Sequence, residues 1–203
     1  MPGKVDEKKS RSKTASRRKK HKTIKFPKVW KDNVPTIHFI MTGGTIDSFW
    51  ERSKDTVKPH KESVIPQFVK SLDIYENLEF TEICMKDSRE LTSEDLKALL
   101  KVVEESPHKR IIITHGTYTM SDTAKFLKAR LKKKDKIIIL TGSLVPLTGF
   151  APSDAPFHLG YAIAMTQKLE PGIYVCMNGR VLEPDEVFKY LYEARFMSIF
   201  GEI

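Results

Sequence analysis

The amino-acid sequence predicts an α/β fold in which a doubly wound, mainly parallel sheet carries helices on both faces. Short runs of β-branched residues alternate along the chain with amphipathic stretches, an order that is typical of such a sheet. The runs Ile111-Ile112-Ile113 and Ile137-Ile138-Ile139-Leu140 are apolar throughout, as strands buried on both faces require. We expect right-handed crossovers to join the parallel strands.

Five strands and four helices are expected beyond Pro35. The second helix has the clearest start, because Thr92 and Ser93 precede Glu94 and Asp95, whose acids would lie at the positive end of the helix dipole. The expected strands are Thr36–Met41, Leu78–Met85, Arg110–Thr114, Lys136–Thr141 and Gly172–Met177, and the expected helices are Ser63–Leu72, Ser93–Glu104, Ser121–Lys132 and Ala155–Thr166.

The charge of the chain is distributed unevenly. Of 203 residues 40% are hydrophobic, which is enough for one domain with a real core and short for two. Residues 1–35 hold 13 Lys/Arg and 3 acids, whereas the remaining residues hold 22 and 23, so the net charge of +9 lies in the N-terminal segment. We expect a basic arm over residues 1–35 and an α/β domain over residues 36–203.

The arm has almost no large apolar residues before Ile24, so we expect it to be disordered in isolation. Its cluster Arg17–Lys22 fits a nuclear address, a contact with RNA phosphates or an acidic partner, or a solubilising extension. Binding through residues 4–31 would be non-specific and sensitive to salt. Phe26–Trp30 could act as a short anchor on the domain.

The cysteines and the hydropathy of the chain indicate its cellular compartment. Cys84 and Cys176 lie in apolar β-like runs and are too few for a disulfide framework. No apolar run approaches the roughly 20 residues needed to cross a bilayer, and the N-terminus lacks the apolar core of a secretory signal. We therefore expect a soluble protein in a reduced intracellular compartment, most simply the cytoplasm, with no membrane association.

Four loops directly follow expected strands. They are residues 42–45, 86–90, 114–118 and 141–143. Ligands of doubly wound sheets bind outside the carboxyl ends of the strands, so we expect these loops to meet at one rim and to form the site.

The rim loops carry hydroxyl groups. Gly43-Gly44 allows a sharp turn that would place the Thr45 hydroxyl at the rim beside backbone N–H groups able to hold an oxyanion, although a plain glycine turn is the alternative. Thr117 adds a second hydroxyl and Ser88 a third. A threonine nucleophile needs a base or a charged partner, and Lys189 is a candidate if it is desolvated.

The histidines show no pair with ligand spacing, so we expect no metal site. His115 stands at a turn, where a structural hydrogen bond is favoured over a ligand role.

Taken together, these motifs resemble the N-terminal domain of the bacterial-type L-asparaginase family, from Thr36 to about Phe196. The resemblance implies hydrolysis of a side-chain amide to the acid and ammonia through a threonine nucleophile, without metal or organic cofactor. The matching segments are Thr42–Ile46, Asp87–Thr92, Ile113–Met120, Leu140–Pro146, Ser153–Ala155, Phe157, Leu159-Gly160, Met177–Arg180 and Val187–Lys189.

By this resemblance Thr45 matches the nucleophile, Thr117 the second catalytic threonine, Lys189 its partner and Ser88 a contact to the substrate carboxylate. Gly44, Arg89 and Tyr118 complete the expected substrate-binding set. In two-domain members a C-terminal domain completes a neighbouring subunit's site. Because this chain ends at Ile203, it resembles the short, single-domain type, and the family implies a homodimer or a dimer of dimers.

One position departs from the family. Tyr118 stands where the family has an aspartate that holds the substrate's α-ammonium and pairs with the lysine. A phenol is neutral at pH 7 and cannot balance two cations. Loss of one member of a buried charge pair costs on the order of 3–5 kcal/mol, and loss of an acid–base partner roughly 10²–10⁴ in rate. Asp122 and Asp47 are the nearest possible substitutes.

Two smaller departures accompany it. Arg89 adds a positive charge beside Ser88. The loop after Thr45 offers only Phe49 and Trp50, which lack the hydroxyl of the tyrosine that the family supplies there.

Three functions remain open at this point. The first is an active amidohydrolase with altered selectivity, for example for a substrate without a free α-ammonium. The second is a weak or inactive homologue kept as a structural component whose basic arm docks on RNA or an acidic partner. The third is a module that binds or senses a small molecule.

Overall fold

The computed structural model describes residues 22–24 and 33–201. Its main sheet has the strand order β1-β5-β2-β6-β7-β8-β9. The inner strands run parallel, whereas β1 and β9 pair antiparallel at the two edges. The strands of this sheet are β1 (Lys22–Ile24), β2 (Thr36–Gly43), β5 (Asn77–Lys86), β6 (Arg110–Thr114), β7 (Ile137–Thr141), β8 (Gly172–Met177) and β9 (Arg180–Leu182).

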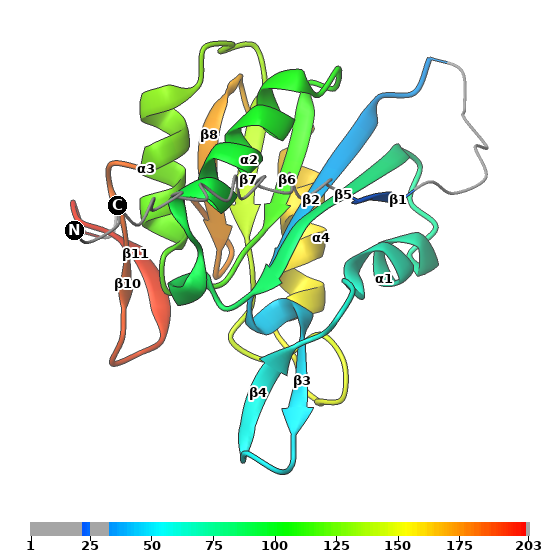
Figure 1. Cartoon of the computed structure of the whole chain (residues 1–203). Helices are drawn as coiled ribbons and strands as arrows, with labels where there is room; N and C mark the ends of the chain where they lie inside the picture. Colours follow the sequence, from blue (N-terminus) through cyan, green and yellow to red (C-terminus); the bar gives the residue numbers. More distant parts are fainter. Residues whose placement is uncertain (1–21, 25–32, 202–203) are drawn as a thin grey trace, which may run out of the picture.

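Four helices cover the sheet on both faces (Figure 1). Two apolar clusters show the division: Leu99 of α2 and Leu127 of α3 pack on one face, and Val69 of α1 and Leu159 of α4 pack on the other. This three-layer arrangement confirms the predicted doubly wound sheet. The helices are α1 (Ile65–Ser71), α2 (Ser93–Glu105), α3 (Met120–Arg130) and α4 (Ala155–Met165).

The five predicted strands and four predicted helices are all present, with ends shifted by a few residues. The predicted start of α2 is confirmed, since Thr92 and Asp95 form a reciprocal capping box. Helix α1 begins at Ile65 instead of Ser63, because the Asp47 carboxylate accepts hydrogen bonds from the Ser63 hydroxyl and the Val64 amide.

Two hairpins and two short 3-10 turns were not predicted. The first hairpin, β3 (Ser48–Glu51) with β4 (Thr56–Pro59), follows the turn η1 (Thr45–Asp47) and projects from the end of the sheet (Figure 1). The second is β10 (Val187–Tyr190) with β11 (Arg195–Ser198). The turn η2 (Ser88–Glu90) follows β5.

Strand β1 lies inside the segment that the sequence analysis assigned to the disordered arm, so for residues 22–24 that expectation is wrong. Ile24 pairs with Phe80 of β5, and Lys22 forms a 2.7 Å ion pair with Glu62. The edge of β5 supplies the backbone partners of β1. The sequence of these three residues, which stand among lysines, has no pattern that indicates this pairing. The expected anchor Phe26–Trp30 lies outside the described residues. Among the residues described, no helix is long and apolar enough to cross a membrane.

Candidate active site

The loops that follow β2, β5, β6 and β7 are pressed together at one rim, as predicted. Gly44 has φ +84°, and a Cβ placed on it would lie 2.4 Å from the Gly116 Cα and backbone nitrogen. The Gly44 amide donates to the Lys86 carbonyl at 2.8 Å. A Cβ on Gly116 would meet Ser88, and one on Gly142 would meet the His115 carbonyl. The glycines therefore allow four loops to touch through their backbones.

Thr45 is the first residue of η1, directly after Gly44, and it is half-buried. Its hydroxyl forms no hydrogen bond within the described part of the chain. The contact between Gly44 and Gly116 brings the backbone before Thr45 against the backbone before Thr117. This geometry places both threonines on the same rim.

Thr117 and Lys189 meet directly. The Lys189 amine donates to the Thr117 hydroxyl oxygen at 2.8 Å, and the Thr117 side chain is buried. Lys189 comes from β10, 72 residues further along the chain. Burial, and then the nearby Arg89 guanidinium, lower the Lys189 pKa below its ordinary value. A lowered pKa leaves more of the amine neutral and able to take a proton from the hydroxyl.

Tyr118 lies beside this pair, at the mouth of the site, with 54% of the residue exposed. Two cations lie over its ring: the Arg89 guanidinium at 4.4 Å from the centroid and the Lys189 amine at 4.6 Å. Arg89 also holds Asp87 in a two-point ion pair, with distances of 3.0 and 2.9 Å. The ring thus offers cation–π contacts where a carboxylate would have neutralised charge.

Neither of the two acids that the sequence analysis offered as substitutes forms an ion pair with Lys189. Within the described residues, no acid forms an ion pair with Lys189. Asp47 is buried and is held by Ser63 and Val64, and burial raises its pKa to about 6. Asp122 is exposed on the first turn of α3. Both candidates from the sequence are therefore engaged elsewhere or turned to solvent.

His115 has the structural role that the sequence favoured. Its Nδ1 donates to the Gly116 carbonyl at 2.7 Å, and its Nε2 accepts from the Thr123 hydroxyl at 2.9 Å. Both bonds fit the neutral ring, and burial lowers the His115 pKa to about 4. His115 thereby ties the site loop after β6 to helix α3.

Ser88 is buried in η2, against Gly116. Its hydroxyl has no hydrogen-bond partner in the described part of the chain. An unpaired buried hydroxyl is costly, which favours a ligand group as its partner.

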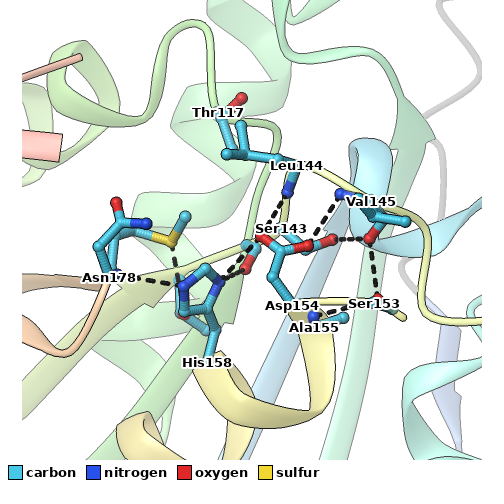
Figure 2. A network of polar contacts seen from close by, with 12 residues as sticks. Thr117, Ser143, Leu144, Val145, Ser153, Asp154, Ala155, His158 and Asn178 are labelled. Carbon is cyan, nitrogen blue, oxygen red and sulfur yellow. Dashed lines mark hydrogen bonds and ion pairs between the residues drawn. The ribbon is translucent and has the colours of Figure 1, made fainter. Parts of the chain in front are cut away.

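The sequence analysis assigned no role to the network of polar contacts around Asp154 and His158 (Figure 2). The Asp154 carboxylate accepts from the Leu144 and Val145 amides at 2.8 and 2.9 Å and so holds the loop after β7. The His158 Nδ1 donates to the Gly142 carbonyl at 2.9 Å, and its Nε2 accepts from the Asn178 amide at 3.1 Å.

Asn178 extends the network to the second hairpin. Its side-chain oxygen accepts from the Phe196 amide of β11 at 2.9 Å, and Phe196 pairs with Lys189 in the hairpin register. The asparagine-glycine turn at residues 178–179 was the visible signal, because such a pair predicts a tight turn between strands. No pattern in the sequence near Asn178 indicates its long-range hydrogen bond to β11.

The two aromatic residues of the first hairpin each pack against another ring. The Phe49 ring lies 5.1 Å from the His60 ring, and the Trp50 ring lies 6.3 Å from the Phe150 ring.

Threonine and serine hydroxyls and a desolvated lysine gather on the carboxyl rim of this doubly wound α/β domain, a set of residues suited to acyl transfer through a hydroxyl nucleophile. The chain belongs to the asparaginase family: residues 36–196 match the family model described as "Asparaginase, N-terminal".

Relatives and solved structures agree with this assignment. L-asparaginase 2 of Bacillus subtilis is 31% identical over 175 residues, covering 78% of this chain and 45% of the relative. L-asparaginase 2 of Escherichia coli is 30% identical over 165 residues, covering 77% and 47%. The probable cytoplasmic L-asparaginase of Campylobacter jejuni superposes with a TM-score of 0.71 at 27% identity, over 82% of this chain and 54% of that one. The chain thus spans about half the length of these relatives.

Proposed function

We propose that this protein is an amidohydrolase that releases ammonia from a side-chain amide through a threonine nucleophile. The observation that carries the proposal is the 2.8 Å contact between the Lys189 amine and the buried Thr117 hydroxyl, at the rim that also holds Thr45. The comparisons support the proposal, because relatives named L-asparaginase share the domain.

The proposed reaction has two steps. The Thr45 hydroxyl attacks the amide carbon and gives up its proton, and that proton ends on the amide nitrogen. The carbon–nitrogen bond breaks, ammonia leaves and an ester to Thr45 remains. Water then attacks the ester. The Thr117–Lys189 pair takes a proton from the water and returns it to the Thr45 oxygen as the ester bond breaks, which frees the acid and restores the Thr45 hydroxyl. Ser88 would hold the substrate carboxylate, since its buried hydroxyl has no other described partner.

Tyr118 lowers the expected turnover of asparagine itself. The Tyr118 ring has no negative charge to receive the substrate's ammonium, and Lys189 and Arg89 lie over it. The second candidate function, an inactive homologue whose basic arm docks on RNA or an acidic partner, is favoured by the concentration of positive charge in residues 1–35. A cytoplasmic location would suit either function.

Ammonia release from a panel of amides tests the proposal. The wild-type chain is compared with Thr45→Val and Lys189→Met, which are expected to lower the rate at least about 100-fold. Thr56→Val on the exposed strand β4 and Lys125→Met on the exposed side of α3 serve as controls and should keep the rate. Equal loss in controls and site variants, or no release from any amide, would refute the proposal.

A further inference from the structure

The charge around Tyr118 is positive in a way that the proposed reaction does not require. Lys189 and Arg89 both lie within 5 Å of the Tyr118 ring centroid. Asp87, an acid beside Arg89, is occupied by the two-point pair with it. Within the described residues Lys189 has no acid partner. An ammonium group entering here would meet the Lys189 amine, the Arg89–Asp87 pair and a neutral ring, with no carboxylate left for it.

The same rim suits an anion for two further reasons. Helix α3 begins at Met120, directly after Thr117–Thr119, so its positive end faces the loop that carries Thr117. The Ser88 hydroxyl is buried, unpaired and packed on Gly116, one residue before Thr117. A carboxylate bound here would gain the Ser88 hydroxyl and the Lys189 amine as hydrogen-bond donors, with the Arg89 guanidinium as a nearby positive group.

Two side chains at the mouth of the site are open to solvent. Tyr118 is 54% exposed, and Arg89 is exposed beside it. A phenol also presents an apolar face against which a neutral acyl group can pack.

We propose that the site takes side-chain amides that carry a carboxylate and no free ammonium, and that Tyr118 and Arg89 set this selectivity. Succinamate and N-acylated asparagine have this chemistry in common. The inference rests on the proposed amidohydrolase function and names its substrate class.

The test compares kcat/KM for ammonia release from four amides by the full-length protein. Succinamate and N-acetyl-L-asparagine fit the class, L-asparagine carries the ammonium, and propanamide lacks the carboxylate. We expect kcat/KM for succinamate, N-acetyl-L-asparagine or both to exceed that for L-asparagine and propanamide by about tenfold or more. The better of these two substrates shows which kind of amide the site takes. Ammonia release with L-asparagine equal to or ahead of both would overturn the inference and leave the proposed function standing.

Two variants tie the selectivity to the residues named. Arg89→Gln should reduce the preference for succinamate over L-asparagine several-fold, whereas Arg130→Gln, at the far end of α3, should leave it unchanged. Tyr118→Asp should reverse the preference. An unchanged preference in both Arg89→Gln and Tyr118→Asp would contradict the assignment.

Binding measurements test the charge preference of the site separately from the proposed catalysis. If no amide releases ammonia, the proposed function fails, and calorimetry with succinamate and L-asparagine as probes then decides the charge preference. Tighter binding of succinamate, weakened in Arg89→Gln, would support the anionic selectivity. Equal or weaker binding than L-asparagine would refute it.

Discussion

Replacing Gly44 by alanine should disrupt the contact on which the site depends. Gly44 adopts φ +84° and ψ −177°, a region that is essentially restricted to glycine, and forcing another residue into it costs about 1–3 kcal/mol. The new Cβ would lie 2.4 Å from two backbone atoms of Gly116, so the loops after β2 and β6 must separate. Overpacking of this kind costs about 1–3 kcal/mol more. The expected loss is therefore about 4 kcal/mol.

Gly149 provides a matched control. It also has positive φ, at +79°, but a Cβ there would meet nothing within 4 Å. Gly149→Ala should therefore lose only the backbone term, about 1 kcal/mol. In urea unfolding, a slope of about 2 kcal/mol/M turns these losses into midpoint shifts of about 2 M for Gly44→Ala and about 0.5 M for Gly149→Ala. Equal shifts would refute the close contact between the loops.

Three further predictions concern other parts of the molecule. The folded state lowers the His115 pKa to about 4 from about 6.5, so the stability from the neutral ring is complete above pH 6.5 and is lost as pH falls to 4. As pH falls from 6.5 to 4, the free energy of unfolding should drop by about 3 kcal/mol more in the wild type than in His115→Gln. Parallel curves of unfolding free energy against pH for the two proteins would contradict this. Asp154→Ala leaves the Leu144 and Val145 amides without acceptors and should cost about 2–4 kcal/mol in the same assay, whereas exposed Asp135→Ala should cost almost nothing. Deleting residues 1–21 removes nine Lys/Arg and should leave the melting temperature nearly unchanged while lowering the salt needed to elute the protein from heparin. A large loss of stability would instead assign that segment to the folded domain.

Much of the fold could be predicted because its central strands contain runs that are apolar throughout. The isoleucine runs of β6 and β7 are buried on both faces, and burial on both faces is what their composition indicates. The hairpin strands have four residues each, too few for a period to stand out, and β1 depends on an edge that only the assembled sheet presents.

The candidate site could be predicted as a set of residues but not as a geometry. Glycines and hydroxyls after apolar strands identified the rim, and the family resemblance selected Lys189. The position of Lys189 depends on Asn178 and Phe196, which meet only when β11 folds back on the turn after β8. The two cations over the Tyr118 ring likewise come from segments far apart in sequence. The resemblance implied an aspartate at the position of Tyr118, whereas the contacts around Tyr118 come only from the structure.

The effect of Tyr118→Asp on L-asparagine hydrolysis tests the central claim most directly. If Thr45 and the Thr117–Lys189 pair form working machinery that lacks only an anion at this position, kcat/KM for L-asparagine should rise by roughly 100-fold or more over wild type. A folded variant with the Thr117–Lys189 contact preserved and no gain in ammonia release would contradict the account.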